Sequence, residues 1–204
     1  METKVIGVIG AGSIGTAFTK QALKAGYQVI LSNSRGPESL AGIISELGSG
    51  VSAGKAEDAV KADVVVLSVK WGNVADVLKN VPAWKGQILI DTANAVVAVG
   101  EQYQHADLGG KPSSEVVSEL APGARVVKAF NTLTPELLSS DPHVSGGNRV
   151  LFMSGNDAEA KAEVLKIMKN MGFSGVDLGS LETGGKLQQF PGGSIPGLNL
   201  IKLP

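Results

Sequence analysis

Hydrophobic residues along this chain alternate between short β-branched runs and longer stretches in which apolar positions recur at helical spacing. The runs at residues 4–9 and 63–69 are continuous, as in strands that are covered by helices on both faces. Residues 37–47 instead place apolar side chains three or four positions apart, which is typical of an amphipathic helix. The alternation predicts repeated βαβ units around a mostly parallel sheet.

The predicted elements end chiefly at glycines and begin at capping residues or prolines. We expect strands at residues 4–9, 29–31, 51–53, 63–69, 87–90, 125–129, 149–153 and 175–178. We expect helices at residues 13–25, 37–47, 55–61, 73–81, 113–120, 135–138 and 157–171. Asn156 and Glu159 predict a capping box for the last of these helices. This order of elements indicates the α/β class.

Two parts of the chain do not follow this pattern. Residues 93–111 have no clear period and exceed the usual length of a connection, so we expect a functional loop there. After Gly179, closely spaced glycines and prolines interrupt any regular element, which predicts a short irregular C-terminal extension. We therefore expect residues 1–178 to form one domain and residues 179–204 to extend it.

Composition narrows the range of partners. The chain has 204 residues, of which 43% are hydrophobic, which suits one well-filled core. Its formal net charge is -1, so the charge balance favours a small-molecule partner over nucleic acid or an anionic membrane. The sequence has no cysteine, no histidines at metal-ligand spacing and no run of about 18 apolar residues. We expect a cytoplasmic protein without a metal site.

A glycine motif lies between the first predicted strand and the helix after it: Gly10-Ala11-Gly12-Ser13-Ile14-Gly15. In this context the three glycines match a dinucleotide-binding fingerprint. The first permits a tight turn, the second lets a pyrophosphate approach the backbone, and the third packs the helix against the strand. The N–H groups at the start of the helix would bind the anion. The motif predicts a Rossmann-type doubly wound sheet.

The residues after the second strand indicate which nicotinamide cofactor is bound. They read Ser32-Asn33-Ser34-Arg35, without the aspartate or glutamate that binds a ribose 2′-hydroxyl. Arg35 can offer a planar pair of donors to a 2′-phosphate, and Asn33 and Ser34 add neutral donors. An arginine in a loop is more often simple surface, but the missing acid at the same place favours NADPH.

Further polar and aromatic residues follow the next strands, at the carboxyl edge where open α/β sheets bind ligands. Ser68, Val69 and Trp71 follow the fourth strand, and Trp71 is equally suited to line a nicotinamide pocket or to pack under a loop. Two more groups reach the same edge, Asp91-Thr92-Ala93-Asn94 and Lys128-Ala129-Phe130-Asn131-Thr132. For Asp91 and Thr132, a capping or turn role explains the residue equally well.

Four separated stretches resemble the NADPH-dependent deazaflavin (coenzyme F-420) reductase family and its bacterial relatives: residues 10–15, 33–35, 67–71 and 127–132. The resemblance implies hydride transfer between C4 of NADPH and C5 of a flavin-like ring, without a covalent enzyme intermediate. It assigns no catalytic residue and implies a homodimer. By position it assigns Ala11 to Ile14 to the pyrophosphate, Ser34 and Arg35 to the 2′-phosphate, and Val69, Asn73, Asn94 and Ala129 to the ribose and nicotinamide.

The chain departs from the family pattern on the side of the second substrate. Lys70 replaces an expected proline, and both the loop at 93–111 and the glycine-rich tail differ. The acceptor is therefore expected to be a deazaflavin, an ordinary flavin or another small molecule. One alternative is a non-catalytic NADPH-binding sensor or regulator. Another is a pyrroline-carboxylate-reductase-like imine reductase, which would need a helical substrate and dimerisation domain that the chain has no room for.

Overall fold

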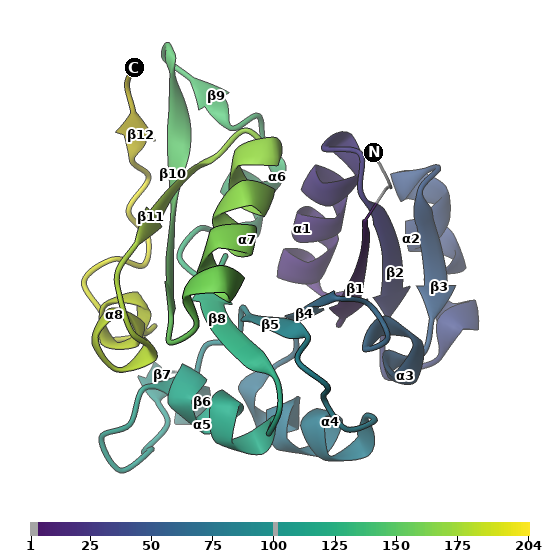
Figure 1. Ribbon diagram of the computed structural model, residues 1–204, viewed down its shortest axis with the longest axis horizontal. Coiled ribbons are helices and arrows are strands. Elements are labelled where there is room, and N and C mark those ends of the chain that lie inside the picture. The colour runs from purple at the N-terminus through teal and green to yellow at the C-terminus, as the bar shows by residue number, and fades with distance from the viewer. Residues whose placement is uncertain (1–3, 100–101) are drawn as a thin grey trace.

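A mostly parallel sheet with helices on both faces organises the computed structural model, which describes residues 4–99 and 102–204 (Figure 1). The strands of this sheet are β1 (Val5–Ile9), β2 (Gln28–Ser32), β3 (Val51–Gly54), β4 (Val64–Leu67), β5 (Ile88–Asp91), β8 (Arg125–Ala129), β9 (His143–Val144), β10 (Gly147–Gly155), β11 (Ser174–Asp177) and β12 (Ile201–Lys202). A separate hairpin consists of β6 (Val96–Val99) and β7 (Gln102–His105).

Except for α8, the helices lie between the strands in the order that the hydrophobic pattern predicts. They are α1 (Ser13–Lys24), α2 (Ala41–Leu47), α3 (Ala56–Ala59), α4 (Val74–Asn80), α5 (Ser113–Leu120), α6 (Pro135–Ser139), α7 (Ala158–Asn170) and α8 (Leu181–Gln188). Two 3-10 turns, η1 (Pro37–Leu40) and η2 (Trp71–Asn73), lead into α2 and α4.

The strand order is β11-β10-β8-β5-β4-β1-β2-β3, and β9 and β12 pair with β10 outside this path. Neighbouring strands from β8 to β3 are parallel, whereas β10 runs antiparallel to β8 and carries the parallel strand β11 on its other side. The chain order reverses at β1, which lies between β2 and β4. This is the predicted Rossmann-type doubly wound fold, with its switch point beside β1.

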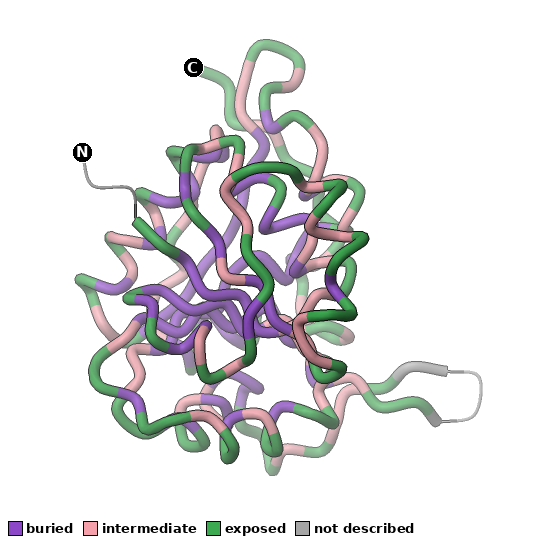
Figure 2. Tube along the Cα trace, turned by 90° about the vertical axis from the view of Figure 1, so that its right-hand side faces the viewer, coloured by how far each residue is buried: buried purple, intermediate pink, exposed green. Residues whose placement is uncertain are grey.

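The core explains why the central strands read as continuous apolar runs. On β4, Val64 and Val66 belong to the cluster that packs against α1 and α7, and Val65 and Leu67 belong to the cluster against α4 and α5. All four side chains are buried. Helices on both faces leave no solvated side of the strand, so the period-two alternation of a half-exposed strand is lost. The buried residues lie at the centre of the molecule in Figure 2.

One predicted helix cap is wrong. Asp157, and not Asn156, caps α7, because the Asp157 carboxylate accepts a hydrogen bond from Ala160 N at 2.7 Å. The Asn156 side-chain oxygen instead accepts one from Leu181 N at 3.0 Å, at the start of α8. Asn156 therefore connects α8 to the end of β10 and does not cap its own helix.

Residues 93–111 contain more regular structure than the sequence predicted. The hairpin β6–β7 occupies part of this segment, and Figure 2 shows it projecting from the body of the molecule. Its strands are only four residues long, too short for alternation to be recognised.

The tail also contains a helix where its glycines led us to expect none. Ser180 caps α8 by accepting a hydrogen bond from Thr183 N. A Cβ atom on Gly184 would lie 2.6 Å from Ser154 Cβ, and one on Gly185 would lie 3.1 Å from Pro112 Cβ. The glycines are therefore needed for close packing of α8 against β10 and the segment before α5. The rest of the tail is irregular apart from β12.

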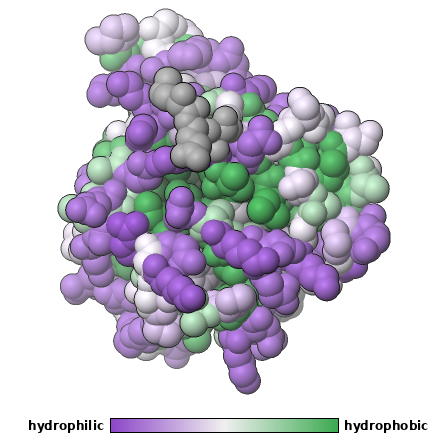
Figure 3. Space-filling model, turned by 45° about the vertical axis from the view of Figure 1, so that its right-hand side comes forward, coloured by the Kyte–Doolittle hydropathy of each residue, from purple (hydrophilic) through white to green (hydrophobic). Residues whose placement is uncertain are grey.

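Polar side chains cover most of the face drawn in Figure 3, with a smaller group of hydrophobic side chains among them. Within residues 4–99 and 102–204, no helix is both long and apolar enough to cross a bilayer. The same part of the chain has no group of three or more histidine or acidic side chains placed to hold a metal ion.

Candidate functional site

The glycine motif forms a tight turn between β1 and α1. Gly10 has φ of +112°, and a Cβ atom there would overlap the Ser68 carbonyl oxygen. A Cβ atom on Gly15 would overlap the Gly10 carbonyl oxygen, so this glycine is required for α1 to pack on the turn. Gly12 differs, because a Cβ atom there would meet nothing within 4 Å. Gly10 and Gly15 therefore build the turn, and Gly12 leaves its outer side open.

The first turn of α1 is arranged to receive an anion. Gly12 is its N-cap and supplies no capping side chain, and the first turn contains no acidic residue. Within residues 4–99 and 102–204, no side chain caps the backbone N–H groups there. Free N–H groups and the positive end of the helix dipole together favour a phosphate at this position.

The turn lies at the switch point of the sheet, where the ends of three strands are joined by backbone hydrogen bonds. Gly10 N donates to Ser32 O at 2.9 Å, and Ser68 N donates to Ile9 O at 2.8 Å. These bonds hold the residues after β1, β2 and β4 at one edge. Ser68 and Val69 are half-buried beside the glycine turn.

The loop after β2 is shaped by Asn33. Its side-chain oxygen accepts a hydrogen bond from Arg35 N at 3.0 Å, and its amide nitrogen donates to Ser39 Oγ at 2.9 Å. Ser34 and Arg35 are exposed. Asn33 therefore stabilises the turn that presents Ser34 and Arg35 to solvent, a role that the sequence alone does not distinguish from direct binding.

The segment after β4 carries Trp71 at the start of η2. The indole is half-buried and packs against the apolar cluster under α4, while Lys70 and Asn73 are exposed. The hairpin strand β6 contacts η2. The loop at 93–111 and the segment around Trp71 thus lie side by side at the carboxyl edge.

A buried ion pair connects the ends of β5 and β8. Lys128 Nζ lies 3.2 Å from Asp91 Oδ2, and the side-chain exposures are 1% and 0%. The Asp91 carboxylate also accepts hydrogen bonds from Ser114 Oγ and Ala93 N, and the Lys128 ammonium donates to the Ala93 carbonyl. Each charged group is therefore fully engaged by protein atoms. Asp91 has the turn role that the sequence allowed, and the structural role of Lys128 was not predicted.

A second buried network surrounds Asn131. Asn131 Nδ2 donates to Asn94 Oδ1 at 3.0 Å and to the Gln188 carbonyl at 2.7 Å. The preceding residue, Phe130, has φ of +63° and packs edge-on against Phe18, with ring centroids 4.9 Å apart. A positive φ is unusual for an aromatic residue, and this bend turns Asn131 toward Asn94 and α8. Gln188 and Ser154, which complete the network, carried no signal in the sequence.

A cavity of about 420 Å³ opens elsewhere, at the amino-terminal ends of the strands. Its charged lining residues are Lys4, Lys61, Asp63, Lys85, Arg125, Glu159 and Glu163. Charges of both signs occur here, and Lys4 is paired with Glu163. Ligands of open α/β sheets bind at the opposite edge, so we place the candidate site at the glycine turn.

Known proteins resemble this chain in sequence and fold. The solved structure of the hypothetical protein SMa0349 from Sinorhizobium meliloti is 44% identical, covers 98% of this chain and 96% of that one, and superposes with a TM-score of 0.91. A candidate F420-dependent NADP-reductase from Arthrobacter sp. is 26% identical over 91% of this chain and 89% of its own, with a TM-score of 0.75. Residues 5–95 match the model of the family described as NADP oxidoreductase, coenzyme F420-dependent.

The match to this NADP oxidoreductase family covers the amino-terminal part of the chain, a little under half of its residues. The matched residues contain the glycine turn, the loop at Asn33–Arg35 and the segment at Ser68–Trp71. Among curated proteins, the rat metalloreductase STEAP3 is 27% identical over 191 residues, which are 93% of this chain and 37% of that protein. The chain thus spans little more than a third of the length of this curated relative. The family resemblance identified from the sequence is confirmed.

Proposed function

We propose that this protein is an NADPH-dependent oxidoreductase that transfers a hydride between NADPH and a flavin-like acceptor, either a deazaflavin or a flavin. The observation that carries the proposal is the open glycine turn and uncapped start of α1 at the switch point of the sheet. It is supported by the adjoining loop, where Arg35 is exposed and residues 32–35 include no acidic side chain.

The residues present fit a dinucleotide phosphate. The open side of Gly12 and the free N–H groups of the first turn of α1, from Ala11 to Ile14, would receive the pyrophosphate. Ser34 and Arg35 would bind the 2′-phosphate through charge-assisted hydrogen bonds. Val69, Asn73, Asn94 and Ala129 would contact the ribose and the nicotinamide, with Ser68, Trp71 and Asn131 around them.

When bound, NADPH supplies a hydride from C4, so two electrons and one proton reach the ring of the acceptor. The task of the protein is to hold the two rings face to face and to limit access of water. The buried pair Asp91–Lys128 would fix the backbone on either side of the nicotinamide end. Solvent can supply the second proton to the reduced acceptor, so no acidic side chain is required.

Anaerobic oxidation of NADPH tests the proposal. The purified protein is mixed with NADPH and, in parallel, with deazaflavin, FMN, FAD and riboflavin, and the absorbance of NADPH is followed. A ferric chelate is included because the rat relative is named a metalloreductase. Saturable oxidation with a flavin-like acceptor is the expected result. Tight NADPH binding without turnover on any acceptor would instead indicate the sensor or regulator.

We also propose that residues 1–178 bind NADPH as one domain, which residues 179–204 complete. In addition, we propose that the protein is a homodimer. Several exposed hydrophobic side chains in the C-terminal segment are consistent with an interface: Leu187, Phe190, Leu198, Leu200 and Leu203. Light scattering after size-exclusion chromatography is expected to give twice the mass of the chain. The chain mass alone would contradict the dimer without affecting the proposed chemistry.

A further inference from the structure

Gln188 is a fully buried amide in the last turn of α8, far along the chain from the residues assigned to NADPH. Its Nε2 lies 3.2 Å from the Phe152 carbonyl, 3.4 Å from the Lys128 carbonyl and 3.3 Å from Asn131 Oδ1. Its Oε1 accepts a hydrogen bond from Ser154 Oγ at 2.8 Å. Every polar atom of this side chain is therefore used inside the protein.

Backbone carbonyls fix the direction of each hydrogen bond in this network. A carbonyl oxygen can only accept, so the atom of Gln188 between the carbonyls of Phe152 and Lys128 must be the amide nitrogen. The main-chain carbonyl of Gln188 lies 2.7 Å from the Asn131 side chain, so the atom of Asn131 that faces it must also be a nitrogen. Asn131 Oδ1 then faces Gln188 Nε2, and neither amide can be reversed without placing two acceptors together.

The same logic extends to Asn94. Asn131 Nδ2 has two hydrogens, one for the Gln188 carbonyl and one for Asn94 Oδ1. Asn94 must therefore present its oxygen to Asn131 and direct its nitrogen elsewhere. Asn94 is half-buried beyond the end of β5, and its Nδ2 makes no hydrogen bond within residues 4–99 and 102–204.

We infer that Gln188 is a positioning residue that orients the Asn94 amide as a hydrogen-bond donor toward the nicotinamide half of NADPH. This inference rests on the proposed function. It specifies what the site recognises there, namely an oxygen acceptor, which on this half of the cofactor is the carboxamide carbonyl or a ribose hydroxyl. Gln188 itself does not touch the ligand.

The test compares the affinity for whole NADPH with the affinity for its adenosine half alone. Gln188→Met keeps the length and volume of the side chain but removes its hydrogen bonds, so Asn131 Oδ1 loses its donor and only the main-chain carbonyl of residue 188 still holds Asn131. We expect NADPH to bind about tenfold more weakly, as for one lost hydrogen bond. Adenosine 2′,5′-bisphosphate, which lacks the nicotinamide half, should bind with unchanged affinity. Gln189→Met, one position along the chain and outside the network, is the matched control and should change neither affinity.

A double-mutant cycle distinguishes positioning from a general structural role. Asn94→Ala removes the donor itself, so Gln188→Met should have no further effect on NADPH affinity in that background. Equal effects of Gln188→Met with and without Asn94 would overturn the inference, as would unchanged NADPH binding in the single variant. If Gln188→Met does not fold, Ser154→Ala, which removes the hydroxyl that donates to Gln188 Oε1, should give a smaller loss with the same selectivity.

A cofactor analogue identifies which oxygen of NADPH accepts the hydrogen bond from Asn94. The thionicotinamide analogue of NADPH replaces the carboxamide oxygen by sulfur, a weak acceptor. If Asn94 donates to that oxygen, the wild type binds the analogue more weakly than NADPH, and Gln188→Met reduces this preference. If Asn94 donates to a ribose hydroxyl, Gln188→Met weakens both equally. Failure of the wild type to bind NADPH would refute the proposed function, whereas normal binding with an unaffected Gln188→Met would refute only this inference.

Discussion

Lys128 Nζ and Asp91 Oδ2 lie 3.2 Å apart in the interior of the sheet edge, and both side chains are excluded from solvent. Breaking such a pair leaves one charge buried without its partner, which typically costs about 3–5 kcal/mol. Asp91→Asn should therefore lower the free energy of unfolding by about 3 kcal/mol, measured by urea denaturation.

The double variant Asp91→Leu/Lys128→Met is the informative comparison, because it leaves no unpaired charge. It should be destabilised by less than the sum of the two single variants. Glu119→Gln is the control, since the Lys111–Glu119 pair is exposed, and its unfolding midpoint should hardly change. Additive losses in the double variant would contradict the buried-pair explanation.

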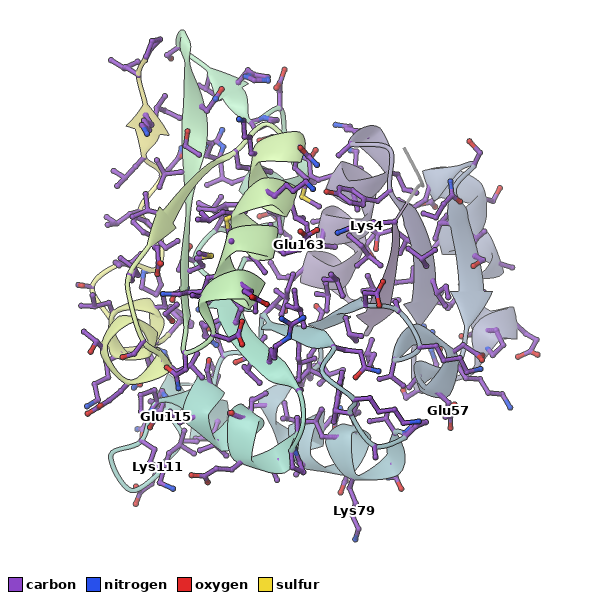
Figure 4. The ribbon with its side chains drawn as sticks, viewed as in Figure 1. Lys4, Glu57, Lys79, Lys111, Glu115 and Glu163 are labelled. Atoms are coloured by element: carbon purple, nitrogen blue, oxygen red, sulfur yellow. The ribbon has the colours of Figure 1, made fainter. Side chains whose placement is uncertain are left out.

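Arg35→Ala should weaken NADPH binding by at least about tenfold and leave NADH binding nearly unchanged. The reason is that the guanidinium is expected to bind the 2′-phosphate, which NADH lacks. Fluorescence titration with both cofactors measures the effect. Lys79→Ala removes a cation from α4, where the side chain points away from the body in Figure 4, and should alter neither affinity. Equal losses for NADPH and NADH would contradict the assignment of Arg35.

Gly12→Ala should fold normally and bind NADPH at least about tenfold more weakly. Its added methyl group meets no protein atom within 4 Å, and its φ of -80° suits alanine. The methyl group would, however, occupy the space through which the pyrophosphate approaches the backbone. Thermal unfolding and cofactor titration on the same sample separate the two effects.

Gly42→Ala, on α2 and equally free of neighbours, is the control for Gly12→Ala and should leave NADPH binding unchanged. Gly15→Ala should behave in the opposite way to Gly12→Ala, because its Cβ atom would overlap the Gly10 carbonyl. A large loss of stability in Gly12→Ala would show that Gly12 also supports the fold.

The ion pair between Lys4 and Glu163 predicts a pH-dependent contribution to stability. Lys4 Nζ lies 2.5 Å from Glu163 Oε1, and Figure 4 shows the two side chains facing one another between β1 and α7. The hydrogen bond to Glu163 raises the pKa of Lys4 above its usual value. The pair therefore stabilises the fold fully at pH values below the ordinary lysine pKa of about 10.4, and its contribution is lost as the pH rises through the raised value.

Because Lys4 is half exposed, Glu163→Gln should cost less than about 1 kcal/mol at pH 7. The difference from wild type should disappear at a pH above the raised pKa of Lys4. Glu46→Gln, an exposed acid on α2, is the control and should show no such dependence. A difference that persists at high pH would mean that Glu163 stabilises the protein by packing alone.

The central strands and the glycine turn could be predicted from the sequence because their signals are local. Burial on both faces makes β4 a continuous apolar run, and the tight turn at Gly10 requires glycine whatever its distant neighbours are. The same holds for the loop at Arg35, because the lack of an acidic residue at positions 32–35 can be read directly from the sequence. These features define the fold and the candidate phosphate-binding half of the site.

The remainder depends on contacts between residues far apart in the chain. Gly184 has the appearance of a helix breaker, yet it allows α8 to approach Ser154 closely. The hydrogen bond between Asn131 and Gln188 joins residues 57 positions apart, so no local sequence pattern predicts it. The candidate nicotinamide end was therefore predicted less completely than the phosphate end.

The separation of 57 residues along the chain between Asn131 and Gln188 has a consequence for how the protein is made. During synthesis, residues 94 and 131 leave the ribosome long before residue 188, and until then Asn131 lacks the carbonyl and the amide that fix its orientation. The glycine turn at residues 10–15, the candidate phosphate-binding half, leaves the ribosome earlier, together with its neighbouring strands. A nascent chain would thus acquire the two halves of its candidate cofactor site at different times, and the nicotinamide half would be completed only once α8 has emerged.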